Sequence, residues 1–265
     1  MKKITIVSSK KYIRSSQFKS LIEVLDSKKI VYEYIDLDKC EDDVKINSDS
    51  IILGLGGDGT ALRAMKLGWI NKVPVLNIGS GRIGYLVNSI DDIDITSLLA
   101  KTNKEYSKPR TPIIQNQEAN SPAFNEIVII KNSPTRLLDL EIQTYEQKVK
   151  LRADGIIIST SLGSTAYNYS AGGPIVQTSI NTLIITPISP FTKFPRSIVL
   201  DKKSIIKIKV AKNQNYSIQF DGIENISTIS NEDEYYEYLL SEDYLDVYYE
   251  KDIPKLDLFL NQILR

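Results

Sequence analysis

The sequence predicts an α/β domain with a parallel sheet, followed by a second domain rich in β-strands. Strand-like and helix-like segments alternate up to about residue 100. After about residue 102 the apolar runs become short and strand-like, and few of the gaps between them contain a convincing helix. Alternation is typical of parallel sheets with short crossovers, whereas successive short strands indicate a β-rich domain. We therefore expect one domain at 1–101 and another at 102–251.

The elements of the first domain follow from apolar runs and their spacing. Ile4–Val7 is short and apolar, which is typical of a buried strand. Phe18, Leu21, Ile22 and Leu25 recur at helical spacing and predict a helix over about 16–28. Further strands are expected at 31–35, 51–55 and 73–78, and further helices at 60–67 and 91–100.

The second domain shows a different pattern, in which most of the apolar runs have the length of strands. The expected strands are Glu126–Ile130, Leu138–Thr144, Gly155–Thr160, Leu183–Pro187 and Ser204–Val210. Between them, Ser164–Ser170 is the best candidate for a helix. Towards the C-terminus, Tyr244–Tyr249 is expected to be a strand. Residues 253–264 are expected to form a helix because Leu256, Phe259, Leu260 and Ile263 fall on one face.

Composition excludes several classes of function. Lys and Arg together number 33, and so do Asp and Glu, so no global basic field attracts nucleic acid or a membrane. The absence of histidine excludes Ser-His-Asp and Cys-His catalysis and histidine zinc sites. Cys40 is the only cysteine, which rules out a disulfide within the chain and favours a reducing compartment. The N-terminal apolar run is too short for a signal peptide, so we expect a cytoplasmic protein.

A glycine-rich turn, 54–60, follows an expected strand and precedes an expected helix. Its G-x-G-x-x-G spacing alone is a weak signal. Glycine lets a ligand approach the backbone closely, and the N–H groups at a helix start can hold phosphate oxygens. We therefore take Gly56, Gly57, Gly59 and Thr60 as candidate phosphate-binding residues.

Asp58 does not suit a simple phosphate cradle, because a carboxylate there repels an anionic ligand. It could act as a general base on an attacking hydroxyl, or it could help to bind Mg²⁺. The structural alternative is a capping aspartate in a tight turn. The P-loop motif and the His-Arg-Asp loop of protein kinases are both absent.

A second cluster, Asp154–Pro174, is dense in glycine and small hydroxyl residues. Hydroxyl groups both donate and accept hydrogen bonds, which suits ribose and amide recognition, and Tyr167 could offer a ring face or a hydroxyl. The alternative is an ordinary Ser/Thr-rich loop. Upstream, Asn125 could hold an amide or hydroxyl edge, and Glu126 could accept two ribose hydroxyls. An Asn-Glu pair at the start of a strand is common, however, and means little alone.

Together these segments resemble the NAD kinase family. Residues 56–60 resemble its Gly-Gly-Asp-Gly-Thr motif, 124–126 its Asn-Glu motif, and 154–174 its hydroxyl-rich signature; 185–190 and 220–222 resemble two later segments. Their order and spacing fit as well. Lipid kinases and phosphofructokinases share the Gly-Gly-Asp motif, whereas the 154–174 block is far more specific.

The resemblance implies a fold, an assembly and a reaction. The implied fold is an N-terminal Rossmann-like α/β domain and a C-terminal β-sandwich-like domain, with the active site between them and the final helix, 252–265, returning to the first domain. Homodimers or homotetramers are implied, whose subunits complete each other's sites. The implied reaction phosphorylates the 2′-hydroxyl of the adenosine ribose of NAD with ATP or polyphosphate, giving NADP. Mg²⁺ or another divalent cation would neutralise the nucleotide phosphates, without a direct protein ligand that can be assigned.

The resemblance also implies roles for individual residues. Asp58 would accept the proton of the ribose hydroxyl. The residues implied to contact NAD are Asp58, Gly59, Asn125, Glu126, Arg136, Arg152, Asp154, Thr165, Ala166, Tyr167, Asn168, Tyr169 and Ser170. Arg136 rests on spacing rather than on a motif, and Asp221 is implied to lie near the ligand. Two departures stand out: 80–86 replaces a segment that usually ends Leu-Gly-Phe-Leu, and Phe191 stands where relatives often carry histidine.

Two other functions remain open at this point. A lipid or diacylglycerol-type kinase would use the same Gly-Gly-Asp turn but should lack the 154–174 block. A non-catalytic NAD sensor would keep the ribose contacts and lose the base, so the presence of Asp58 counts against it.

Overall fold

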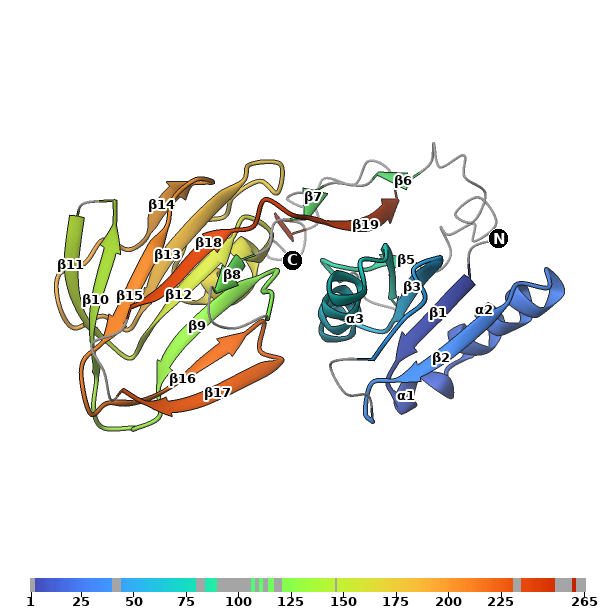
Figure 1. The fold of residues 1–265 in the computed structure, drawn as a ribbon, viewed down its shortest axis with the longest axis horizontal. Helices are drawn as coiled ribbons and strands as arrows, with labels where there is room; N and C mark the ends of the chain where they lie inside the picture. Colours follow the sequence, from blue (N-terminus) through green and yellow to red (C-terminus); the bar gives the residue numbers. More distant parts are fainter. Residues whose placement is uncertain are drawn as a thin grey trace. The chain divides into compact units, whose positions relative to one another are not determined.

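The structure is a computed structural model, and it divides into two compact units. One unit comprises 1–111 together with 244–265, and the other comprises 112–243 (Figure 1). The residues that the structure describes are 3–39, 44–79, 84–89, 106–107, 110–111, 114–116, 121–145, 147–230, 235–250 and 259–260.

A parallel sheet forms the centre of the first unit. Its main strands, in spatial order, are β2 (Tyr32–Asp36), β1 (Lys3–Ser8), β3 (Ser50–Leu55), β4 (Val75–Gly79) and β19 (Leu245–Glu250). Each of these strands runs parallel to its neighbours. Three short strands extend the sheet: β5 (Asn88–Ser89) is parallel to β4, and β6 (Tyr106–Ser107) and β7 (Arg110–Thr111) are antiparallel to β19.

Helices cover this sheet, as expected for an α/β unit. They are α1 (Lys10–Ile13), α2 (Ser16–Ser27) and α3 (Asp58–Asn71). The helix α2 begins after Ser15, whose hydroxyl oxygen accepts the N–H of Phe18 at 3.1 Å. Leu21 and Leu25 of α2 are buried in one cluster with apolar residues of β1 and β3, while α3 packs against β3 and β4. The helix expected at 91–100 lies outside the described residues.

The second unit contains two antiparallel sheets. The first, in spatial order, consists of β11 (Gln147–Ala153), β10 (Leu138–Thr144), β15 (Ile206–Val210), β18 (Tyr236–Leu240) and β8 (Ile114–Asn116). The second consists of β14 (Ile198–Asp201), β13 (Thr182–Ile188), β12 (Gly155–Thr160), β9 (Glu126–Lys131), β16 (Asn215–Phe220) and β17 (Glu224–Ile229). A 3₁₀ helix, η2 (Leu162–Thr165), and the short helix α5 (Tyr167–Ser170) follow β12.

The two antiparallel sheets share one core. Leu140 and Ile142 of the first sheet are buried in the same cluster as Ile129 and Ile156 of the second. Along β10, buried residues alternate with partly exposed ones, which is the period of a strand with one face on a core. The expected β-sandwich-like unit is therefore confirmed, as is the α/β unit before it.

The limits of the units differ from the ranges 1–101 and 102–251 that the sequence indicated. The strand β19 belongs to the first unit, because Val247 and Tyr248 pair with Val75 and Leu76 of β4. Of the final helix expected at 252–265, only Phe259 and Leu260 lie within the described residues. The ring of Phe259 is buried and lies 5.6 Å from that of Tyr85 in the same unit.

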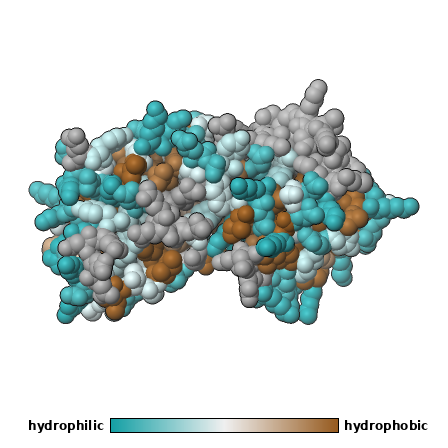
Figure 2. Space-filling view, viewed as in Figure 1, coloured by the Kyte–Doolittle hydropathy of each residue, from teal (hydrophilic) through white to brown (hydrophobic). Residues whose placement is uncertain are grey.

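Hydrophobic surface is divided into separate groups on the face of the molecule that Figure 2 shows, with hydrophilic residues between them. Within the described residues, no helix combines the length and the apolar character needed to cross a membrane. The cytoplasmic location stays a prediction from the sequence.

Candidate active site

The glycine-rich turn joins β3 to α3 and places Asp58 at the first position of that helix. A Cβ at Gly56 would lie 2.4 Å from Oγ1 of Thr60, so the turn needs glycine there. Space is open where a Cβ of Gly57 or Gly59 would stand, as far as the structure describes the chain. The first N–H groups of a helix have no acceptor within it and attract anions. The turn can therefore admit phosphate oxygens beside Asp58.

Two backbone amides fix the Asp58 carboxylate. The N–H of Tyr85 donates to Oδ2 at 3.1 Å, and the N–H of Leu86 donates to Oδ1 at 3.0 Å. Each carboxylate oxygen can accept a second hydrogen bond. The arrangement therefore orients Asp58 and still leaves it able to accept a proton or a hydrogen bond from a ligand.

Two tyrosine hydroxyls lie near this carboxylate. Burial raises the pKa of Tyr249, and the negative charge of Asp58 raises it further. The pKa of Tyr85 is raised by the same two causes, burial first. Tyr249 is 9% exposed and comes from β19, so the C-terminal strand contributes to the surroundings of Asp58. The local sequence around Tyr249 gave no signal of this role.

Gly84 approaches Asp58 closely. A Cβ at this position would lie 2.6 Å from Oδ1 of Asp58 and 2.6 Å from Cγ2 of Val87. Both distances are shorter than any ordinary carbon contact, so a larger residue must displace one of these groups. Gly84 belongs to the segment 80–86, which the sequence analysis marked as a departure from the family pattern.

Substituting Gly84 with alanine is expected to move the Asp58 carboxylate and to lower kcat by about 10- to 100-fold, because small misplacements of a reacting group are costly. Steady-state rates of phosphoryl transfer would measure this. Val87→Ala is the matched control, since it trims the other neighbour and leaves Asp58 in place, and it should keep kcat close to that of the unmodified chain. An unchanged kcat in Gly84→Ala would show that this contact does not position Asp58.

In the second unit, Asp221 organises the Asn-Glu segment at the start of β9. Its carboxylate accepts the N–H of Phe124 at 2.7 Å, of Asn125 at 2.7 Å and of Glu126 at 3.0 Å. In return, the N–H of Asp221 donates to the carbonyl of Glu126 at 3.0 Å. Asp221 stands in the turn after β16 with a φ of 52°, which aspartate tolerates better than most residues. This side chain therefore connects the β16–β17 turn to two candidate ligand-binding residues.

Glu126 is the most perturbed acidic residue of this segment. Its side chain is 7% exposed, and burial raises its pKa to about 8, with a further contribution from the charge of Asp221. The backbone N–H of Tyr167 opposes this rise by donating to the carboxyl group. Perturbed carboxyl groups of this kind are typical of functional sites.

The hydroxyl-rich loop after β12 packs onto the same segment. The hydroxyl of Thr160 donates to the carbonyl of Phe124 at 2.6 Å, and the N–H of Thr160 donates to that of Asn125 at 2.9 Å. A Cβ at Gly163 would lie 2.1 Å from the Asn125 carbonyl oxygen, so only glycine fits. Asn125, Glu126 and the loop from 160 to 170 thus form one cluster, which we call the loop cluster.

Within the loop cluster, Asn168 faces inwards. Its amide nitrogen donates to the carbonyls of Ser164 at 3.1 Å and Pro174 at 3.0 Å, and its oxygen accepts the hydroxyl of Thr186 at 2.7 Å. Tyr167 and Tyr169, by contrast, are 37% and 41% exposed. The loop therefore uses Asn168 to hold its shape and presents tyrosines outside.

Asp154 lies at the opposite end of β12 from the loop cluster. Lys131 pairs with its Oδ1 at 2.5 Å, and both side chains are partly exposed. The N–H of Lys131 also donates to the Asp154 carbonyl at 2.9 Å. Lys131 was not among the candidates from the sequence, because its pairing across the β9–β12 ladder has no local signal.

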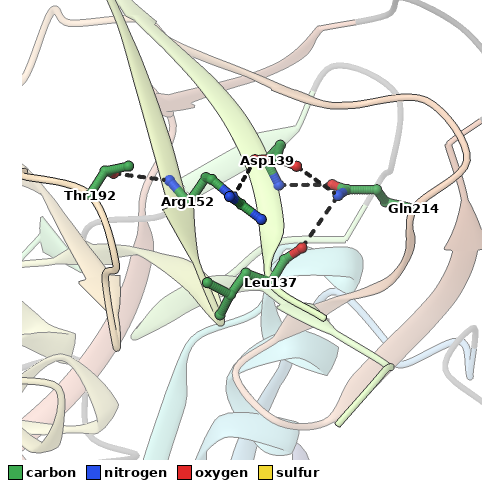
Figure 3. Close-up of polar contacts among 5 residues, drawn as sticks. All are labelled: Leu137, Asp139, Arg152, Thr192 and Gln214. Atoms are coloured by element: carbon green, nitrogen blue, oxygen red, sulfur yellow. Dashed lines mark hydrogen bonds and ion pairs between the residues drawn. The ribbon is translucent and has the colours of Figure 1, made fainter. Parts of the chain in front are cut away.

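Arg152, in β11, is part of the polar network that Figure 3 shows. The side-chain Nε of Arg152 pairs with Oδ1 of Asp139 at 2.9 Å, and the backbone N–H of Arg152 donates to the hydroxyl of Thr192 at 3.1 Å. Gln214 holds Asp139 from the far side, donating to Oδ2 at 3.2 Å and accepting its N–H at 2.8 Å. The guanidinium carbon lies 5.9 Å from the centre of the Phe191 ring. Arg152 is thus oriented by Asp139 and Thr192, which the sequence did not single out, and it lies beside Phe191, which it did.

The structure does not bring all the candidates of the second unit together. Arg152 and Asp154 precede the six-residue strand β12, and Thr165–Ser170 follow it. A strand of this length spans roughly 20 Å. Arg136 is exposed on the loop before β10. Within the described residues, no three acidic, cysteine or histidine side chains gather as a metal site would require.

Known proteins share both units of this chain. The model of the ATP-NAD kinase N-terminal domain matches residues 2–106, and that of the ATP-NAD kinase C-terminal domain matches 124–247. The NAD kinase of Methanothermobacter thermautotrophicus is 35% identical over 201 residues, covering 74% of this chain and 71% of that protein. The NAD kinase of Methanosphaera stadtmanae is 38% identical over 191 residues, covering 69% and 68%.

A solved structure shares the fold over almost the whole length. The crystal structure of an NAD kinase from Archaeoglobus fulgidus in complex with ATP matches with a TM-score of 0.77 and 24% identity, covering 99% of this chain and 98% of that one. Both domain models, the close relatives and the shared fold agree with the resemblance that the motifs indicated. The chain belongs to the ATP-NAD kinase family.

Proposed function

We propose that this chain transfers the terminal phosphoryl group of ATP to the 2′-hydroxyl of the adenosine ribose of NAD, giving NADP and ADP. One observation carries the proposal beyond family membership. The Asp58 carboxylate is fixed by two backbone amides at the start of α3, beside glycines with open space. An oriented carboxylate next to an anion-binding helix start suits phosphoryl transfer to a hydroxyl.

In this reaction Asp58 accepts the proton of the 2′-hydroxyl while the ribose oxygen bonds to phosphorus and the bond to the ADP oxygen breaks. The N–H groups at the start of α3 hold phosphate oxygens beside Gly57 and Gly59. Mg²⁺ entering on the nucleotide would supply charge neutralisation of the phosphates. Correct positioning of the hydroxyl against this carboxylate supplies much of the rate.

The loop cluster is the proposed site for the dinucleotide. Asn125, Glu126 and the exposed faces of Tyr167 and Tyr169 would contact NAD, together with the backbone of Thr165 and Ala166 and with Ser170. Asn168 would act by holding the loop, because its amide is bonded within the chain. Asp221 would preserve the conformation of the Asn-Glu segment.

Arg152 and Asp154 are proposed to serve a dinucleotide bound to a partner subunit. Their separation from the loop cluster by the length of β12 supports this assignment, since one small group cannot touch both ends. The proposal requires a homodimer or homotetramer. Light scattering in solution tests it, and a particle of 29.9 kDa, the mass of one chain, would contradict it.

The two other candidate functions gain no support from the relatives described above. An NAD kinase, a lipid kinase and a non-catalytic NAD sensor are distinguished by the product formed in one assay. Purified protein is incubated with Mg²⁺ and ATP plus either NAD or diacylglycerol, and NADP is measured with an NADP-specific dehydrogenase. We expect NADP from NAD and no phospholipid. Binding of NAD without NADP formation would favour the sensor, and phosphatidic acid would favour the lipid kinase. Replacing ATP with polyphosphate in the same assay identifies the donor.

A further inference from the structure

We propose that Glu126 meets the dinucleotide as a neutral carboxylic acid that donates a hydrogen bond to a ring nitrogen or sugar oxygen. The sequence alone suggested the opposite role, a carboxylate that accepts two ribose hydroxyls. This inference rests on the proposed function, because it assigns a chemical role within that binding site.

The first support is the geometry of the Glu126 side chain. It is 7% exposed, and its Oε2 atom is buried with no hydrogen-bond partner among the described residues. Within the described part of the chain, the carboxyl group receives one backbone N–H, that of Tyr167 at the start of α5. A buried carboxylate with a single donor would be costly. A neutral acid needs fewer donors and has one O–H to give.

The second support is the neighbouring carboxyl group of Asp221. It accepts three backbone N–H groups, from Phe124, Asn125 and Glu126, at 2.7 to 3.0 Å. Such donors stabilise an ionised carboxylate. A nearby negative charge disfavours ionisation of a second carboxyl group. Since the donors favour charge on Asp221, the proton belongs on Glu126.

Among the residues that the structure describes, the remaining neighbours of Glu126 bring no compensating cation. The strand β12 places Ser159 opposite it, β16 places Phe220 beside Ile127, and α5 contributes the Tyr167 N–H. Asp221 is the charged group that faces it from the β16–β17 turn, within the part of the chain that the structure describes. In agreement with this geometry, burial and Asp221 together raise the pKa of Glu126 to about 8.

A consequence follows for binding at alkaline pH. Above about pH 8 Glu126 loses its proton, so the donor disappears and a buried charge takes its place. NAD itself gains or loses no proton between pH 6.5 and 9.5. The dissociation constant for NAD should therefore stay constant up to about pH 7.5 and then rise, approaching about tenfold per pH unit for one linked proton.

The binding test is calorimetric titration of the full chain with NAD, without ATP, from pH 6.5 to 9.5. Glutamine mimics the neutral acid, so Glu126→Gln should bind NAD within about threefold of the unmodified chain at pH 7 and should lose the alkaline rise. Glu242→Gln, at an exposed position, is the matched control and should keep that rise. The proposal would be overturned if Glu126→Gln bound NAD more than tenfold more weakly at pH 7 and the affinity of the unmodified chain for NAD did not fall at high pH.

Thermal melting without NAD tests the charge state independently of function. A folded-state pKa raised to about 8 means that the folded protein holds a proton the unfolded chain has released, so the stabilising effect of that proton is lost as pH rises towards 8. The melting temperature of Glu126→Gln, relative to the unmodified chain, should therefore increase between pH 5 and 8 and then level off. If the melting temperatures of the two proteins change with pH in parallel, only the neutral state of Glu126 is contradicted. If the unmodified chain binds no NAD at any pH, the proposed function is contradicted as well.

Discussion

Asp58→Asn is expected to abolish NADP formation while NAD still binds. Asparagine has the size of aspartate, and its oxygen can still accept the N–H of Leu86, which donates to Oδ1 at 3.0 Å. The amide cannot take up the proton of the ribose hydroxyl. Loss of a general base typically costs about 10²- to 10⁴-fold in rate, so kcat should fall by at least about 100-fold while the dissociation constant for NAD changes little.

The experiment pairs an initial-rate assay for NADP with a calorimetric titration of NAD. Asp201→Asn is the matched control: it makes the same chemical change at an exposed carboxylate that is bonded to Tyr145 and to the N–H of Lys203. It should leave both readouts unchanged. If the Asp58→Asn protein forms NADP at close to the normal rate, Asp58 is not the general base.

The fold class could be predicted from the sequence because both units repeat simple patterns. Alternating strands and helices indicated the parallel sheet, and the short apolar runs indicated the antiparallel unit. What local patterns could not indicate was the place of β19. Its residues read as a strand, but its parallel pairing with β4, through Val247 and Tyr248, joins segments far apart in the chain.

The strand β11 was not expected from the sequence, for a physical reason. In β11 most side chains are exposed, so the strand lacks an apolar run, and its turn uses Tyr145 at a φ of 52° in place of the usual glycine or asparagine. The β16–β17 hairpin did carry a signal, because Asp221-Gly222 is a dipeptide that favours tight hairpin turns.

The candidate site was predictable where motifs are continuous and was not where the contacts are long-range. The turn at Asp58 and the loop after β12 could be located from their glycines and hydroxyls. Lys131 beside Asp154 and Tyr249 near Asp58 bring together segments that are separated in the sequence, and Asp139 meets Arg152 across the β10–β11 hairpin. Each depends on strand register, which a single sequence does not fix.

Asp221→Ala is expected to destabilise the protein and to disrupt NAD binding together. Three backbone N–H groups, of Phe124, Asn125 and Glu126, lose their acceptor. Each unsatisfied, partly buried donor costs about 1–3 kcal/mol, so the free energy of unfolding should fall by about 3 kcal/mol or more. The Asn-Glu segment should then lose its shape, and the dissociation constant for NAD should rise by at least about tenfold. Urea unfolding and NAD titration measure the two effects.

A second alanine variant separates the effect of backbone strain on stability from the effect of the lost acceptor. Asn213 has a φ of 61° at an exposed turn, so Asn213→Ala carries the same left-handed strain, about 1–2 kcal/mol, without touching the Asn-Glu segment. If both alanines lower the free energy of unfolding equally and NAD binding survives in Asp221→Ala, the three hydrogen bonds do not shape the site.

Asp221→Asn tests the charge of this side chain separately, because asparagine tolerates this backbone and keeps one acceptor oxygen. Removing the charge also lowers the pKa of Glu126 towards its ordinary value, since Asp221 contributes to the rise. The pH at which NAD binding weakens should then move down, and an unmoved pH dependence in a folded Asp221→Asn protein would show that the two carboxyl groups are not coupled.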